Sequence, residues 1–130
     1  MCMHLMITVM RHATLFFLLI ASVLVSAQNS YTTKYDAINV DGILGNTRLL
    51  NNYLNCLLDK GRCNEEGKTL KEVVPDALIT DCSKCSPTQR TSIEKVIRHL
   101  VKYRRADFNA LAAKYDPQAA YRSKYQKYLA

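Results

Sequence analysis

The sequence has very few of the groups that enzymes use for chemistry. It contains no Gly-x-Ser-x-Gly elbow, no His-Glu-x-x-His pair and no glycine-rich phosphate loop. Beyond an N-terminal apolar segment it has one histidine, His99, which lies between Arg98 and Leu100 in a helical pattern. A lone helical histidine with no nucleophile beside it is more often structural than catalytic. We therefore expect a protein that is not an enzyme and that uses no cofactor.

Strand patterns are also scarce, and the chain has no internal repeat, low-complexity tract or linker. Apolar residues instead recur three and four positions apart, which is the spacing of amphipathic helices. The predicted fold class is all-α, with five clear helices and one shorter first helix. Because nothing in the sequence marks a boundary between units, these helices are expected to form a single domain.

The N-terminal segment has the features of a secretory signal peptide. Arg11 precedes an apolar run, residues 15–25, and small residues follow up to Ala27. A membrane anchor needs about 20 apolar residues, but polar residues follow this run at once. We expect residues 1–27 to be cleaved, leaving residues 28–130 as a secreted, extracellular domain with no stable membrane insertion.

The four cysteines of the expected mature chain are its most distinctive feature. Cys56 and Cys63 form a C-x6-C pair, and Cys82 and Cys85 form a C-x2-C pair. Three pairings are possible, and local pairing is favoured because each cysteine lies at a predicted helix end beside a turn. Loops this short stabilise by only about 2 to 2.5 kcal/mol each on the chain-entropy model. A four-cysteine zinc site and a redox pair at Cys82 and Cys85 are alternatives, but secretion and the helical context argue against them, so no metal is expected.

Positive charge exceeds negative charge, with a formal net charge of +7. The basic residues are dispersed, with denser stretches over residues 95–105 and 114–127. Nucleic-acid binding would require basic residues gathered beside a recognisable reading motif, and no such motif is present. We interpret the excess charge as solvated helix faces and expect no nucleic-acid partner.

The first half of the domain predicts two helices. Residues 41–44 allow one or two turns before Gly45 interrupts them, and Asn46 can cap the next helix. Gly61 is suited to end that second helix. Its apolar stripe consists of Leu49, Leu50, Tyr53, Leu54, Leu57 and Leu58.

Further capping signals predict the remaining helices. Thr69 and Glu72 form a capping-box pattern, and the helix that follows is expected to kink at Pro75. Ser86-Pro87 with Gln89 is a second start signal. A helix carrying Phe108, Leu111, Ala112 and Tyr115 follows, and Asp116-Pro117 is expected to open a last helix that bears Tyr121, Tyr125 and Tyr128.

Three parts of the sequence together resemble the insect chemosensory proteins, also known as the OS-D or pheromone-binding A10 family. The first is residues 31–41, YTTKYDAINVD. The second is the four-cysteine spacing, with Asn55-Cys56 and the segment DCSKC at residues 81–85. The third is residues 113–117, AKYDP, followed by Tyr121-Arg122 and Lys124-Tyr125. The resemblance extends over residues 31–128.

The resemblance implies about six helices around an elongated apolar channel, with the two local disulfides already favoured. Members of the family bind long-chain fatty acids, alcohols, esters and other semiochemicals. The chain would thus be a monomeric carrier of small apolar ligands, in which burial of an alkyl chain contributes about 0.8 kcal/mol per methylene.

Carried over to this sequence, the family's channel gives a set of candidate ligand-binding residues. For the aliphatic members, ordinary core packing is an equal alternative. Tyr35, Tyr53 and Gln89 are stronger candidates, because a polar atom in an apolar wall needs a partner. The family often has tryptophan where Phe108 stands, and an acidic residue where Gly42 stands. The full set is Tyr35, Leu50, Tyr53, Leu54, Leu57, Leu70, Val74, Leu78, Gln89, Ile93, Val96, Ile97, Leu100, Phe108 and Tyr125.

An interaction or developmental role is the alternative to a carrier. It would use the basic, tyrosine-bearing residues 121–128 to contact a chemoreceptor, a cuticle component or an anionic surface.

Overall fold

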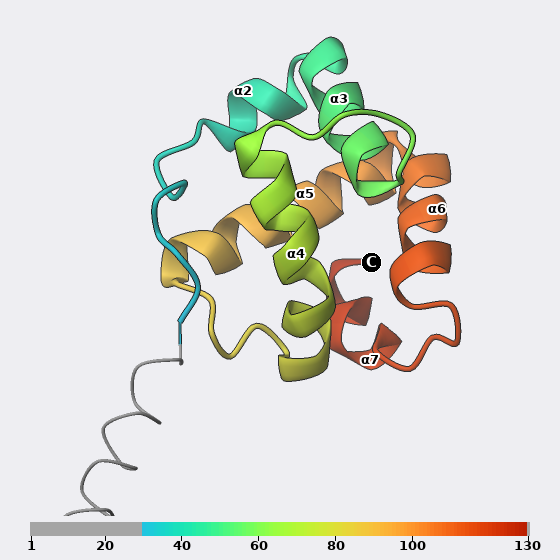
Figure 1. Cartoon of the computed structure of the whole chain (residues 1–130). Helices are drawn as coiled ribbons and strands as arrows, with labels where there is room; N and C mark the ends of the chain where they lie inside the picture. The colour runs from blue at the N-terminus through green and yellow to red at the C-terminus, as the bar shows by residue number, and fades with distance from the viewer. Residues whose placement is uncertain (1–29, 130) are drawn as a thin grey trace, which may run out of the picture. The chain divides into compact units, whose positions relative to one another are not determined.

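The computed structural model describes residues 30–129, so the predicted signal peptide lies outside the described residues. The regular structure of the described part is all helical, with no strand, as predicted (Figure 1). It has six α-helices and a short 3-10 helix: α2 (Val40–Leu44), α3 (Thr47–Leu57), α4 (Glu65–Thr80), α5 (Pro87–Tyr103), α6 (Arg105–Tyr115), α7 (Arg122–Tyr125) and η1 (Gln126–Tyr128).

Side-chain caps fix where the first four of these helices begin. Asn46 accepts a hydrogen bond from the Leu49 amide, and Ser86 forms a complete capping box with Gln89, so both predicted starts are confirmed. The predicted start at Thr69 is wrong. The helix α4 begins one turn earlier, where the Asn64 side chain accepts from the Gly67 amide and two glutamates occupy the first turn. Negative charge in the first turn stabilises the helix through its dipole. The Thr69 hydroxyl does not cap a helix and donates to the Glu65 carbonyl instead.

One helix end and one helix start differ from the prediction. The helix α3 ends at Leu57 rather than near Gly61, because Asp59 adopts a left-handed φ of 59° and turns the chain. The helix expected to open at Asp116 starts later, at Arg122. Ala119, at a φ of 53°, prevents a helix from forming between Asp116 and Arg122, and the Asp116 carboxylate accepts a hydrogen bond from the Tyr121 amide. Pro75 lies inside α4 without ending it, and the expected kink stays a prediction.

The buried core lies among α2, α3, α5 and α6. Its centre consists of Leu50 and Leu54 from α3 and Leu100 from α5, each at most 5% exposed. Leu44, Val96, Phe108 and Leu111 pack around this centre. The close helix pairs are α2 with α3, α2 with α5, and α5 with α6, while η1 packs on α5.

The helix α4 has a different position in this arrangement. It packs closely on α3, but within residues 30–129 its backbone approaches none of α5, α6 and α7 as closely. In Figure 1, α4 crosses in front of α5, with α6 and α7 to its right. Its only buried residue is Gly67, which lies against Cys56 and Tyr53 of α3.

Both ends of α4 are held by the disulfides. Cys56 pairs with Cys63 ahead of α4, and Cys82 pairs with Cys85 directly after it, which confirms local pairing. The Cα atoms are 4.8 Å and 5.1 Å apart. Each disulfide therefore fixes a loop beside α4 and ties no distant helices together.

Candidate ligand-binding site

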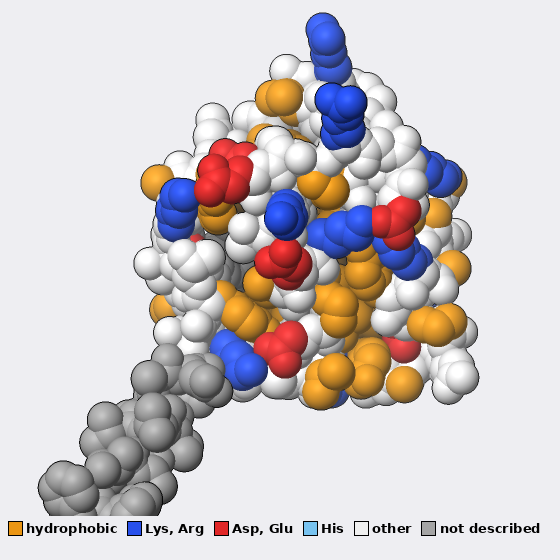
Figure 2. Space-filling model, viewed as in Figure 1, with side chains coloured by type: hydrophobic (Ala, Val, Ile, Leu, Met, Phe, Trp, Pro, Cys, Tyr) orange, Lys and Arg blue, Asp and Glu red, His pale blue; other side chains and the backbone are white. Residues whose placement is uncertain are grey.

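The inner side of α4 carries apolar side chains that the rest of the fold does not cover fully. Val74 and Leu78 are half-buried, and Leu70 is 39% exposed. Figure 2 shows apolar side chains gathered along the side of α4 that faces α6 and α7. We refer to this incompletely covered apolar surface as the apolar groove, and a surface of this kind on a small domain is a candidate binding surface.

The opposite wall of this region comes from α5, α6 and α7. Ile93, Val96 and Ile97 of α5 are half-buried, in contrast to Leu100 in the core. Phe108 of α6 is also half-buried, and its ring meets the ring of Tyr125 edge to face, with centroids 6.2 Å apart. The facing walls are therefore lined by aliphatic and aromatic groups.

The N-terminal arm, residues 31–39, ties one edge of α4. The Tyr31 hydroxyl donates to the Asp76 carboxylate at 2.6 Å, and the Tyr31 amide donates to the Lys84 carbonyl at 3.0 Å. Lys34 pairs with Glu65 at the start of α4, 2.9 Å away. Burial and the hydrogen bond to Asp76 raise the pKa of Tyr31, while the same bond lowers the pKa of the Asp76 carboxyl.

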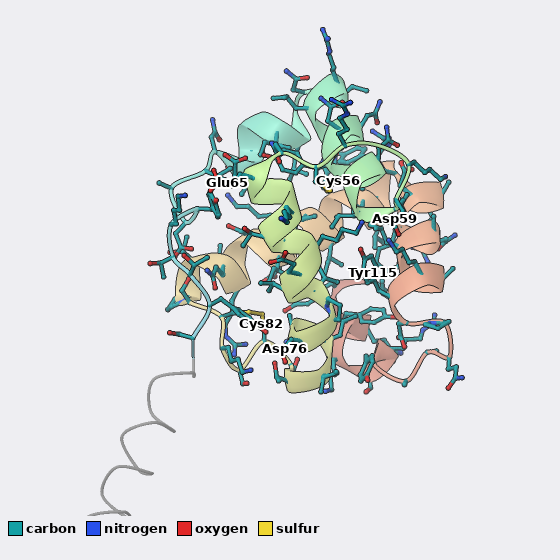
Figure 3. All side chains as sticks on the ribbon, in the orientation of Figure 1. Cys56, Asp59, Glu65, Asp76, Cys82 and Tyr115 are labelled. Carbon is teal, nitrogen blue, oxygen red and sulfur yellow. A yellow bond between two sulfur atoms is a disulfide. The ribbon has the colours of Figure 1, made fainter. Side chains whose placement is uncertain are left out.

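Asp59 ties the other edge of α4. Its carboxylate accepts from Lys71 of α4 and from Lys114 of α6, and these bonds lower the pKa of Asp59 to about 2. Lys114 also donates to the Leu57 carbonyl at 2.6 Å, as Tyr115 does at 2.7 Å. Figure 3 shows Asp59 and Tyr115 between α4 and α6.

Lys124 of α7 ties the C-terminal end of α4. Its ammonium donates to the carbonyls of Leu78 and Ile79, at 3.1 Å and 2.7 Å. The last carbonyls of a helix lack partners within the helix, and α4 has no basic residue in its own last turn. The helix α4 is thus held by polar ties and disulfides at its perimeter, which leaves its inner apolar side free of tight packing.

The predicted site residues fall into groups in the structure. The incompletely buried members are Val74, Leu78, Ile93, Val96, Ile97, Phe108 and Tyr125, which are half-buried, and Leu70, which is exposed. Val96 and Phe108 also pack against the core. In contrast, four predicted residues are buried, as ordinary core packing would have them: Leu50, Leu54, Leu57 and Leu100.

The polar candidates mostly have partners within the protein. The Gln89 amide accepts from the Ser86 amide and donates to Asp36 and the Thr32 carbonyl, so it holds the N-terminal arm. The Tyr125 hydroxyl donates to the buried Asp116 at 2.8 Å, and burial followed by this bond raises the pKa of Tyr125 to about 12.

The two remaining tyrosines of the set lie nearer the surface. Tyr35 is half-buried in the arm, with the Lys34 ammonium 5.3 Å from its ring centre. The Tyr53 hydroxyl accepts weakly from Asn64 at 3.4 Å, and its ring borders a surface hollow of about 320 Å³ that Asn52, Arg62 and Asn64 also line.

A second hollow, of about 330 Å³, lies on the outer side of α5 and is lined mainly by Lys95, Arg98, Lys102 and Tyr103. Neither hollow is the apolar channel that the family resemblance implies. That channel stays a prediction.

Sequence reasoning missed the residues that hold α4 in place. No local motif predicts the contacts of these residues, since their partners are 8 to 55 residues away along the chain or are backbone carbonyls. The residues are Asp59, Asp76, Lys71, Lys114 and Lys124. Only the Lys-Tyr-Asp-Pro segment marked its neighbourhood in advance, because it contains Lys114, Tyr115 and Asp116.

Other kinds of site receive no support from residues 30–129. This part contains no group of three or more His, Cys, Asp or Glu residues arranged to hold a metal ion. None of its helices is both long enough and apolar enough to cross a membrane.

These features define a class: a small disulfide-linked helical protein with an apolar groove. Comparison with known proteins makes the assignment specific. The family model described as "Insect pheromone-binding family, A10/OS-D" matches residues 31–123, and the chain belongs to that family. The predicted resemblance is confirmed, and the fold and family are those of binding and carrier proteins.

Individual relatives agree with this assignment. The chain is 50% identical to ejaculatory bulb-specific protein 3 of Drosophila melanogaster over 104 residues, which is 80% of this chain and 82% of that one. It is 46% identical, with a TM-score of 0.72, to a chemosensory protein solved in complex with bromo-dodecanol, over 75% and 98% of the two chains. The antennal chemosensory protein A6 of the moth Mamestra brassicae gives 44% identity and a TM-score of 0.61, over 69% and 88%.

Proposed function

We propose that this protein is a secreted, monomeric carrier of long-chain apolar molecules, which it binds between α4 and the wall formed by α5, α6 and α7. The observation that carries the proposal is the contrast within α4. Its perimeter is pinned by Tyr31, Asp59, Lys124 and two disulfides, while its inner apolar side chains are only half-buried. A wall held in this way can accept a guest without unfolding.

Binding would be driven by burial of the ligand's alkyl chain. Each methylene removed from water contributes about 0.8 kcal/mol, so full burial of a dozen carbons contributes about 10 kcal/mol against the cost of association. Leu70, Val74 and Leu78 would cover one side of the chain, and Ile93 and Ile97 the other. The bromo-dodecanol complex of the related chemosensory protein supports an aliphatic ligand of this length.

Competition with a fluorescent apolar probe tests the proposal directly. Alcohols and acids of C12 to C18 should displace the probe from the folded, oxidised protein. A complete lack of displacement would contradict the carrier function.

A matched pair of variants locates the ligand. Val74→Trp places a large ring under α4 and should weaken binding of C16 ligands more than that of C12 ligands. Ile79→Trp is the control, because Ile79 lies on the same helix and is 58% exposed. Equal effects of the two variants would place the ligand elsewhere.

Secretion has a test of its own, and one contact in the structure bears on the alternative interaction role. N-terminal sequencing of the protein from culture medium should begin after Ala27 if the signal peptide is cleaved as proposed. The alternative role through residues 121–128 gains no support from Lys124, whose ammonium is occupied by the carbonyls of α4.

A further inference from the structure

One cluster of charged side chains stands at the rim of the apolar groove. It joins Lys71 of α4, Lys114 of α6 and Asp59 of the loop between α3 and α4. The side chains of Lys71 and Lys114 are 33% and 29% exposed, while Asp59 is 59% exposed. Because α4 and α6 do not pack closely, this cluster spans the space between them.

The cluster contains more positive than negative charge. Two ammonium groups share a single carboxylate. Among the described residues, no acidic group besides Asp59 lies within salt-bridge distance of either lysine, and Glu72, which follows Lys71 in the chain, is exposed. A net charge of one positive unit therefore remains at this end of the groove.

The two lysines also keep unused hydrogen-bond donors. An ammonium group has three N–H bonds. Lys114 uses two, toward Asp59 and the Leu57 carbonyl, and Lys71 uses one, toward Asp59. Three donors thus remain on the two lysines. Val74 lies one helical turn from Lys71 on α4, and Leu111 lies one turn from Lys114 on α6. Figure 2 shows charged side chains of both signs directly above the apolar groove.

We propose that the Asp59–Lys71–Lys114 cluster is a head-group site that selects ionised long-chain carboxylates over neutral ligands of equal length. This inference rests on the proposed carrier function and adds the chemical class of the preferred ligand. The alkyl chain lies beneath α4, and the carboxylate accepts from the free donors of Lys71 and Lys114. Asp59 holds the two lysines together in the empty protein and competes with the ligand for them.

The test compares hexadecanoic acid with hexadecanol in the same probe-displacement assay at neutral pH. Lys71→Gln and Lys114→Gln should each lower the ratio of acid affinity to alcohol affinity by about two- to fivefold, the range of a partly exposed ion pair. Lys71→Arg should keep the preference. Lys68→Gln is the matched control, since Lys68 is an exposed lysine on the same helix outside the cluster.

Asp59→Asn separates a head-group site from a purely structural clamp. If the cluster binds head groups, removal of the competing carboxylate should raise the ratio of acid affinity to alcohol affinity by about two- to fivefold. If the cluster only braces α4, the same change should weaken both ligands together. Added salt should reduce acid binding alone, because the ion pair at this rim is screened.

The outcomes distinguish this inference from the function on which it rests. Acid and alcohol affinities that stay in constant ratio across the four cluster variants would overturn the head-group site while leaving the carrier function intact. Failure of both ligands to displace the probe from the unmodified protein would contradict the carrier function itself.

Discussion

The helices α3 and α4 are neighbours in the chain and pack on each other, yet the protein stabilises them in different ways. Both start at an asparagine cap. The helix α3 buries Leu50, Leu54, Cys56 and Leu57, whereas α4, although five residues longer by its bounds, buries only Gly67. The helix α3 is part of the core, and α4 is a wall beside it.

The difference arises from what each helix presents to the fold. The helix α3 has a dense leucine stripe, so apolar burial holds it in place. The helix α4 has Pro75 and several charged residues, and its partners are polar groups of the N-terminal arm, Asp59 and Lys124. Polar ties at the edge of a helix permit its apolar side to stay incompletely packed, and a carrier requires that property of one of its walls.

Truncation of one apolar side chain in each helix should show the difference between α3 and α4 most clearly. Leu54→Ala in α3 should lower the free energy of unfolding by about 3 kcal/mol, because it leaves a cavity in packed surroundings. Val74→Ala in α4 should cost less than about 1 kcal/mol, since half-buried surroundings lose little. Urea unfolding of both variants measures the difference. Equal costs would show that α4 is as well packed as α3.

The disulfides should have an intermediate effect. The double change Cys82→Ser and Cys85→Ser opens the loop after α4 and should lower the free energy of unfolding by about 2 kcal/mol, as the chain-entropy model gives for so short a ring. We expect the loss to appear first as faster amide exchange in the last turn of α4, with α3 unaffected. Uniform exchange across both helices would mean that this loop supports the whole fold rather than one wall.

Local signals predicted much of the fold. The four-cysteine spacing, the Asn46 cap and the Ser86–Gln89 box depend on residues that lie close together in the chain, and the structure has each of them where it was expected. Errors occurred where a local pattern had a stronger local competitor. Asn64 caps α4 in place of Thr69, and left-handed Asp59 and Ala119 turn the chain where glycine or proline was expected to act.

The candidate site was less accessible to sequence reasoning. A helical stripe shows which residues face inward, but it does not distinguish a filled interior from an open one. Leu54 and Val74 occupy equivalent stripe positions, and only tertiary structure shows that the first is buried and the second is half-buried. The ties that produce this difference, such as Lys114 with Asp59, join residues 55 positions apart.

The smallest expected effect is that of acid, which should loosen α4 and leave the rest of the fold largely unchanged. The pKa values of Asp59, Glu65 and Asp76 all lie below their ordinary values, because each carboxylate is hydrogen-bonded to a lysine or tyrosine that ties α4. A carboxyl group with a lowered pKa in the folded state adds stability above its ordinary pKa and loses it as the pH falls toward the folded value. For Asp59 this window runs from 3.8 down to about 2.

Hydrogen exchange at pH 5 and at pH 2.5 would measure this effect, after correction for the intrinsic rate at each pH. Amides of α4 should lose protection relative to those of α3, because the ties of α4 titrate in this range and the leucine contacts of α3 do not. Asp59→Asn should reduce the difference between the two pH values, since one of the titrating ties is then absent at both. Parallel loss of protection in α3 and α4 would mean that the carboxylates act on the stability of the whole domain, and that the wall has no separate freedom to move.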